Sequence, residues 1–190
     1  MLNIVIFGAP GSGKGTQSER MIEKYGLAHI STGDVLRAEI KSGSELGKTA
    51  KEYISKGLLL PDNLIVDILA DILDKQKKSK GVIFDGFPRT IPQAEALKEM
   101  LSERGMDISI VLGLEVEEEE LISRLLNRGK ISGRSDDNME TIKNRLDVYH
   151  NQTNPLKDYY IKEGKYSKIK GAGNIDEIFG QIKKAIAILE

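Results

Sequence analysis

The chain has 190 residues, which suits one domain of moderate size, and 39% of them are hydrophobic, which is enough for a buried core. The net charge of −1 gives no overall positive field for nucleic acid, and the absence of cysteine excludes disulfides, thiol nucleophiles and thiolate-held zinc. The start MLNIVIFGAP lacks the basic segment of a signal peptide, and no stretch reaches the roughly 18–20 apolar residues of a membrane span. We therefore expect a cytoplasmic protein with no nucleic-acid or membrane partner and no zinc.

Apolar runs and helical periodicities alternate along the first half of the chain. The continuous apolar run Leu2–Phe7, which ends at Gly8, predicts a buried parallel strand, and residues 15–26 predict a helix that stops at Gly26. A short strand is expected at Ala28–Ile30. Helices are then predicted over residues 31–43, 44–57 and 60–78.

The same alternation continues to the end of the chain. Strands are predicted over residues 81–85, 108–116 and 166–171, and helices over residues 90–105, 117–129, 139–153, 155–164 and 175–189. No linker, repeat or low-complexity segment divides the chain. Residues 1–190 are therefore expected to form one α/β domain, in which a five-stranded parallel sheet carries helices on both faces.

The stretch GAPGSGKGT, Gly8–Thr16, lies between the first predicted strand and the first helix. Its glycines allow successive backbone N–H groups to point at an anion, and the following helix adds the positive end of its dipole. Gly15 stands where the usual phosphate loop has Ser or Thr, and a hydroxyl comes one residue later. The pattern predicts a site for nucleotide phosphates made by Gly11, Ser12, Gly13, Lys14, Gly15 and Thr16.

Arginines mark a second part of the same site. Of the 28 basic residues only eight are Arg, and five of these fall in or beside predicted loops, or on helices next to them: Arg37, Arg89, Arg128, Arg134 and Arg145. Because the guanidinium group makes planar, two-pronged contacts with phosphate, this set predicts a phosphate cage. A phosphate acceptor needs no general base, since its second pKa is about 6. His29 and His150 are accordingly interpreted as structural or surface residues.

Asp85 ends the apolar strand VIFD. It fits the acidic residue that organises Mg²⁺ and its waters in phosphate-loop proteins, together with the hydroxyl of Thr16. We expect Mg²⁺ to be held through these groups, waters and substrate, and predict no directly bound metal of the protein itself.

Several motifs occur together in one order: the loop GxPGxGKGT, STGDVLR (31–37), GFPRT (86–90) followed by Gln93, SGRSDDN (132–138) and IKNRL with Arg145. In this order the chain resembles the nucleoside monophosphate kinases, and among them the adenylate kinases of the short type, over almost its whole length. The resemblance implies the P-loop NTPase fold, a monomer, and reversible phosphoryl transfer from ATP to AMP, giving two ADP, in adenine nucleotide homeostasis. UMP/CMP kinases, which usually carry Ala and Asn in place of Thr32 and Gln93, are the alternative.

The resemblance also implies residue roles. The catalytic cations would be Lys14, Arg89, Arg128, Arg134 and Arg145, and ATP would contact the phosphate loop, Arg128 and Gly173 of the GAGN turn. The expected AMP contacts are Thr32, Arg37, Leu58, Leu59, Leu60, Gly86, Phe87, Pro88, Arg89, Gln93, Arg134 and Arg145. Leu58 departs from the Lys often found at its position. A non-catalytic nucleotide sensor is the alternative from another class, and the full Arg set argues against it.

Two mobile parts are expected from the resemblance. Residues 31–60 would form the AMP-binding subdomain, and residues 127–137 would form a short lid loop over ATP, too short for an inserted domain. Asp136 and Asp137 either anchor this loop or pair with Arg128 and Arg134, and the alternative is an exposed acidic turn.

Overall fold

Within residues 1–76 and 79–189, which the computed structural model describes, five parallel strands form one sheet in the order β2-β3-β1-β4-β5. The strands are β1 (Leu2–Gly8), β2 (Ala28–Ser31), β3 (Gly81–Asp85), β4 (Ile110–Glu115) and β5 (Tyr166–Lys170). In the register, Ser31 and Ile6 both lie opposite Asp85, and Gly8 lies opposite Leu114. The predicted α/β fold with a five-stranded parallel sheet is thus confirmed.

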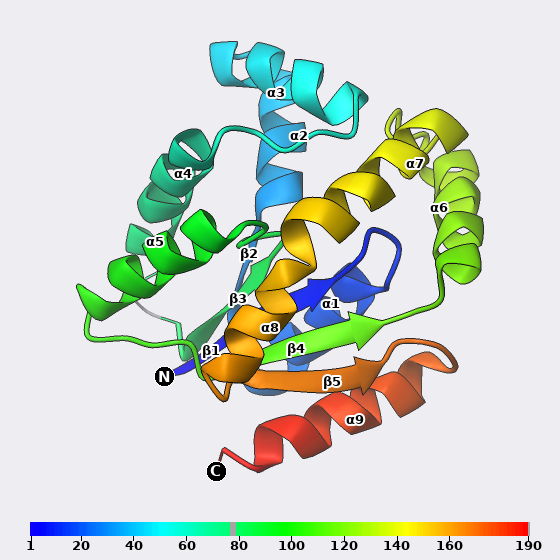
Figure 1. The fold of residues 1–190 in the computed structure, drawn as a ribbon. Coiled ribbons are helices and arrows are strands. Elements are labelled where there is room, and N and C mark those ends of the chain that lie inside the picture. The colour runs from blue at the N-terminus through cyan, green and yellow to red at the C-terminus, as the bar shows by residue number, and fades with distance from the viewer. Residues whose placement is uncertain (77–78, 190) are drawn as a thin grey trace.

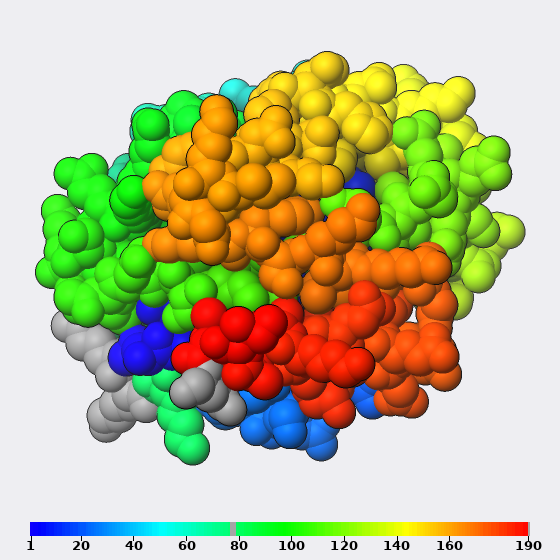
Figure 2. All heavy atoms as spheres, turned by 60° about the horizontal axis from the view of Figure 1, so that its bottom comes forward, coloured from blue at the N-terminus to red at the C-terminus, as the bar shows by residue number. Residues whose placement is uncertain are grey.

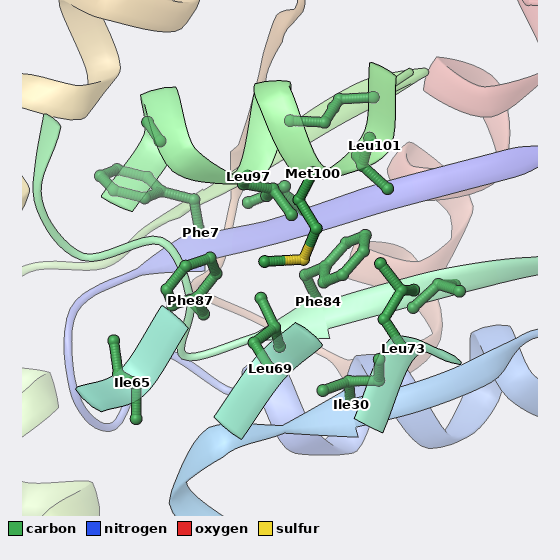
Figure 3. Packing of buried hydrophobic residues seen from close by; sticks show 14 of the residues in the cluster. Phe7, Ile30, Ile65, Leu69, Leu73, Phe84, Phe87, Leu97, Met100 and Leu101 are labelled. Atoms are coloured by element: carbon green, nitrogen blue, oxygen red, sulfur yellow. The ribbon is translucent and has the colours of Figure 1, made fainter. Parts of the chain in front are cut away.

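Helices cover both faces of the sheet (Figure 1). Successive side chains of β1 alternate between these faces. Ile4 and Ile6 pack with α1 (Lys14–Tyr25) and α9 (Ile175–Ala187). Val5 and Phe7 pack on the other side, in the cluster that α4 (Asp62–Asp74), α5 (Ile91–Ser102) and α8 (Pro155–Lys162) complete, part of which Figure 3 shows. Burial on two faces accounts for the continuous apolar run of this strand.

Two helix pairs project beyond the sheet. The first is α2 (Thr32–Ser42) with α3 (Glu45–Ser55), and the second is α6 (Glu118–Ser132) with α7 (Met139–Val148) (Figure 1). Gly47 lets α3 approach α2 closely, because a Cβ atom at this position would lie 2.0 Å from the Glu39 carbonyl oxygen. Figure 2 shows α9 on the surface, with the start of β1 beside it. No helix in the described part of the chain combines the length and the apolar character that a membrane crossing requires.

Two predicted helices end differently in the structure. The helix expected over residues 60–78 stops at Asp74, after its last buried leucine, Leu73, and residues 77–78 lie outside the described residues. The helix expected over residues 139–153 ends at Val148 and continues as a π-helical turn, η1 (Tyr149–Thr153), into α8. The N–H group of Asn154 accordingly donates to the carbonyl of Tyr149, and Pro155, which has no N–H group, begins α8.

The sequence predicts a loop over residues 127–137, with the preceding helix ending at Gly129. This prediction is wrong for residues 127–132. Residues 127–132 complete α6. The helix ends before Gly133, which adopts the left-handed conformation with φ of 65°. Gly129 serves packing instead, because a Cβ atom there would lie 2.8 Å from the Asp137 carbonyl oxygen. The loop that remains, residues 133–138, is called the lid loop below.

Candidate active site

A cleft of about 590 Å³ opens at the carboxyl ends of the strands, the edge where parallel sheets commonly hold ligands. Figure 1 shows β1 and β4 running toward the loop after β1 and toward helix α6, both of which contribute residues to the lining of the cleft. The structure brings into this main cleft residues from all the predicted motifs: Gly11, Ser12, Gly13, Lys14, Gly15, Thr16, Arg37, Asp85, Gly86, Arg89, Arg128, Arg134, Arg145 and Gly173.

The phosphate loop curls because Gly11 and Gly13 adopt left-handed conformations, with φ of 83° and 94°. Helix α1 begins at Lys14, within the last residues of the loop motif, and no side chain among the described residues caps its first turn. The first N–H groups of a helix have no partner within the helix, so these donors and the positive end of the dipole remain free to meet an anion in the cleft.

Lys14 points back across this loop. Its Nζ atom donates to the carbonyl oxygens of Gly8, at 2.8 Å, and Ala9, at 3.1 Å. Burial lowers the pKa of Lys14 to about 8; Asp85 raises it in part, and the positive charge of Arg89 lowers it further. A phosphate that enters beside Lys14 would stabilise its charged form, because the negative charge counteracts the effects of burial and of the neighbouring cations on the pKa.

Arg89 is the second buried cation. Burial lowers its pKa to about 10, and the charge of Arg145 acts in the same direction. Its Nε atom donates to the Gly86 carbonyl at 2.7 Å, and its backbone N–H donates to Oε1 of Gln93 at 2.7 Å. The Gly86 carbonyl thus orients the guanidinium group, and Gln93 holds the backbone from which this side chain extends.

Two aspartates hold two of the remaining arginines. Asp137, whose side chain is 0% exposed, accepts a two-pronged contact from Arg128 at 2.6 and 2.7 Å. Arg145 donates to Asp137 at 2.9 Å and pairs with Asp136 at 3.0 Å. Although burial alone raises the pKa of Asp137, hydrogen bonds from Arg128 hold it below the usual value. The predicted pairing with arginine is therefore confirmed for Arg128, whereas the second arginine that pairs with the aspartates is Arg145 and not the expected Arg134.

Arg37 and Arg134 complete the ring of cations. Arg37 pairs with Asp34 one turn earlier on α2. Burial lowers the pKa of Arg134, and the charges of Arg37 and Arg128 lower it further. A cation whose pKa is lowered by neighbouring cations in a cleft indicates a site that is built for an anionic ligand.

A smaller side pocket of about 80 Å³ adjoins the cleft. Thr32, whose hydroxyl donates to the Gly86 carbonyl at 2.9 Å, and Gln93, whose amide donates to Asp62 at 2.7 Å, lie in its wall. The remaining lining includes Arg37, Leu58, Leu59, Leu60, Gly86, Arg89 and Arg145. Arg89 and Arg145 line both spaces, so a group in the side pocket would meet the same cations as a group in the main cleft.

Phe87 and Pro88 line neither of these spaces. Phe87 is 1% exposed and packs in the core beside Leu69 (Figure 3), and it follows Gly86, whose φ of 77° lies in the left-handed region. Pro88 lines a third cavity, next to Tyr149. Because the Phe87 side chain is buried in the core, the predicted AMP contact at this position is left to its backbone.

Arg124 was not among the predicted site residues. It lies on α6 one turn before Arg128, pairs with Glu120, and donates to the Gly171 carbonyl at 3.1 Å and to the Gly11 carbonyl at 3.5 Å. It therefore joins the phosphate loop to the GAGN turn. Its spacing of four residues from Arg128, which places both on one helix face, was the available signal.

The histidines lie at the margins. Nε2 of His29 is 3.4 Å from Oδ2 of Asp85, behind the cleft, and His150 lies half-exposed beside Glu118 at 3.1 Å. Neither lines the main cleft or the side pocket, which agrees with their interpretation as structural and surface residues.

The sequence matches the model of the adenylate kinase family over residues 6–165. It is 72% identical over 186 residues to the adenylate kinase of Parabacteroides distasonis, with 98% of each chain covered. It is 70% identical over 189 residues to that of Bacteroides fragilis, with 100% of each chain covered. With the adenylate kinase of Azobacteroides pseudotrichonymphae it shares 58% identity over 186 residues, 98% of this chain and 97% of the relative.

Proposed function

The chain belongs to the adenylate kinase family, and on that basis we propose that it catalyses the reversible transfer of the terminal phosphate of ATP to AMP, which yields two ADP. One observation carries the mechanism. The main cleft, which contains the phosphate loop, and the side pocket share the walls formed by Arg89 and Arg145. Two nucleotides bound on the two sides would therefore meet phosphate to phosphate between these guanidinium groups.

The catalytic contribution of the protein is positioning and charge neutralisation, which supply nearly all of the catalysis in phosphoryl transfer. In this proposal the phosphate loop, Lys14 and Arg128 hold ATP, and Gly173 lies against its base. Arg37 seats the AMP phosphate, while Arg89, Arg134 and Arg145 neutralise the group in transit. The acceptor phosphate is already ionised at neutral pH, since its second pKa is about 6, so no side chain has to remove a proton.

Thr16 and Asp85 line the same cleft as the cations, and their hydroxyl and carboxylate oxygens are the donors that Mg²⁺ prefers. The residues therefore fit a site in which Mg²⁺ is held with the ATP phosphates and through waters. When bound, Mg²⁺ would supply further neutralisation of phosphate charge.

Residues 31–60, called the AMP segment below, and the lid loop are proposed to close over the two nucleotides. Water competes with AMP as an acceptor, so closure has to exclude it before transfer. Arg128 lies in the last part of α6 and Arg134 lies in the lid loop, so closing would bring both onto the ATP phosphates. We further propose a cytoplasmic monomer that balances the adenine nucleotides, with no nucleic-acid or membrane partner.

An acceptor panel tests the proposal. With ATP and Mg²⁺ as the donor, the rate of ADP formation is measured with AMP, GMP, UMP and CMP. AMP is expected to be the preferred acceptor. A clear preference for UMP or CMP would establish the pyrimidine alternative, and no ADP formation with any acceptor would favour a nucleotide sensor.

Replacing both Thr32 and Gln93, as Thr32→Ala with Gln93→Asn, is expected to weaken discrimination between AMP and the pyrimidine monophosphates. Both side chains line the side pocket, where the acceptor base is proposed to lie. The ratio of kcat/KM for AMP to that for CMP should fall by more than tenfold, because a hydrogen-bonding site loses selectivity when its polar partners are removed. KM for ATP, measured in the same series, should stay close to the wild-type value. Equal effects on both substrates would place these residues outside the acceptor pocket.

The activity is expected to fall as the pH rises through the pKa of Lys14. Burial lowers this pKa to about 8, so above that pH the free enzyme loses the positive charge that attracts the ATP phosphates. The phosphates themselves stay ionised, since their last pKa is about 6. At saturating AMP, kcat/KM for ATP should decline between pH of about 7 and about 9.5, with kcat less affected because bound phosphate holds the proton on Lys14. A flat profile over this range would contradict this account of Lys14.

A further inference from the structure

The C-terminal end of α3 is held by a neighbouring helix. Two carbonyls of its last turn are satisfied locally, since Leu58 N–H donates to Tyr53 at 3.0 Å and Gly57 N–H donates to Ile54 at 3.0 Å. The next two carbonyls, of Ser55 and Lys56, have no such partner within the helix. They accept instead from α7: the Thr141 hydroxyl donates to Ser55 at 3.2 Å, and the Asn144 amide donates to Lys56 at 3.3 Å.

The contact is close as well as polar. Gly57 lies against the backbone of α7, because a Cβ atom there would be 2.9 Å from the Thr141 carbonyl oxygen and 2.9 Å from Cγ of Arg145. Gly57 and Thr141 are both buried. Thr141 and Arg145 are four residues apart and therefore share a helix face. The end of the AMP segment thus rests on the same turn of α7 that presents Arg145 to the phosphates.

The Thr141 hydroxyl also faces the lid loop. It accepts a hydrogen bond from Nδ2 of Asn138 at 3.0 Å, and the same amide donates to the Ser135 carbonyl at 2.9 Å. Asn138 in turn caps α7 by accepting from the Thr141 N–H group at 3.0 Å. One chain of hydrogen bonds therefore runs from the lid loop through Asn138 and Thr141 to α3.

We propose that Thr141, assisted by Asn144, is a positioning residue that latches the AMP segment over the acceptor pocket in register with Arg145. The inference deepens the proposed function and rests on it. Leu58 and Leu59, which follow the latch directly, line that pocket together with Arg145. Neutral hydrogen bonds of this kind contribute modestly to stability, so the latch can open and close during turnover. Through Asn138 it also links closure of the AMP segment to the lid loop, and such coupling is reciprocal between the two substrates.

The test compares Thr141→Val, which keeps the shape but removes the hydroxyl, with Thr141→Ser, which keeps the hydroxyl. Thr49→Val is the matched control, because the Thr49 hydroxyl bonds a carbonyl within α3 itself. Thr141→Val should raise KM for AMP about three- to tenfold, the range that corresponds to one net hydrogen bond. KM for ATP should rise less, kcat should fall by less than KM for AMP rises, and Thr141→Ser should restore KM for AMP. Asn144→Ala should act in the same direction, but more weakly.

A distance measurement gives a readout that does not depend on turnover. Because the chain has no cysteine, Lys51→Cys on α3 and Lys143→Cys on α7 can carry paired spin labels at exposed sites. Added AMP should narrow the distribution of distances between the two labels in the wild-type background. At the same AMP concentration, the distribution should be broader in Thr141→Val than in that background.

The outcomes separate the two proposals. Absence of ADP formation by the wild-type protein overturns the proposed function. Normal wild-type turnover, with KM for AMP and the distance distribution unchanged in Thr141→Val, overturns the latch alone. An equal rise of both KM values with a lower unfolding midpoint would assign Thr141 a merely structural role, and would overturn the latch too.

Discussion

Lys14→Ala is expected to lower kcat about a hundred- to a thousandfold, the range found when one preorganised electrostatic group is removed from an active site. Lys14 is the single lysine side chain among the described residues that line the main cleft, where its Nζ atom lies on the phosphate loop. No other side chain of the loop carries a positive charge. The measurement is the rate of ADP formation at saturating ATP and AMP, with Lys98→Ala, which removes a surface lysine paired with Glu163, as the matched control.

The fold of this variant is expected to stay intact. Burial lowers the pKa of Lys14 below the 10.5 of the unfolded chain, so at neutral pH the unfolded state holds the proton more favourably than the folded state does. The charged lysine therefore lowers the free energy of unfolding below pH of about 8, and this destabilisation disappears as the pH rises from about 8 toward 10.5. Denaturant unfolding at neutral pH should show Lys14→Ala to be at least as stable as wild type. Near-normal turnover in a folded variant would refute the assignment of Lys14.

Arg89→Ala should also lower kcat by about two to three orders of magnitude, and it should raise KM for AMP. Arg89 lines both the main cleft and the side pocket, and its Nε atom is oriented by the Gly86 carbonyl. Loss of the guanidinium group therefore affects the acceptor and the group in transit together. Arg89→Lys should recover only a small part of the activity, because an ammonium group keeps the charge but not the planar fork.

Arg104→Ala provides the control for Arg89. Arg104 is half-buried and ion-paired with Asp74 at 2.9 Å, and it lines neither space. Its replacement should change stability slightly and leave kcat unaltered. If Arg89→Ala kept kcat near that of Arg104→Ala, the phosphate cage would have to be assigned to other residues.

The elements of the fold are encoded locally, and for that reason they could be predicted. The apolar run Leu2–Phe7, the glycine-rich loop and the helix that ends at Gly26 each depend on neighbours a few residues away. The arginines beside the predicted loops are likewise visible in the sequence, and their number and positions indicate a site for an anion. The local pattern indicated a site for nucleotide phosphates but not which nucleotides bind. The similarity of the motifs to those of adenylate kinases indicated ATP and AMP.

Other features depend on which distant groups approach one another. Gly129 is typical of a helix end by local rules, yet it lies inside α6, where its missing side chain makes room for the backbone of Asp137. Phe87 belongs to a motif expected to contact AMP, yet its side chain lies in the core, where it packs with residues distant in the chain such as Leu69.

The amino-acid sequence by itself determined the strand and helix types, the phosphate loop and the identity of the cations, because these follow from residue type and short-range spacing. Only the tertiary structure decided the pairing of Asp137 with Arg128 and Arg145, the bridge that Arg124 makes, and the contact between Thr141 and Ser55, which are 86 residues apart in the chain. The physical reason is that hydrogen bonds and close packing act over a few ångströms in space, and a linear pattern does not report which distant segments come that near.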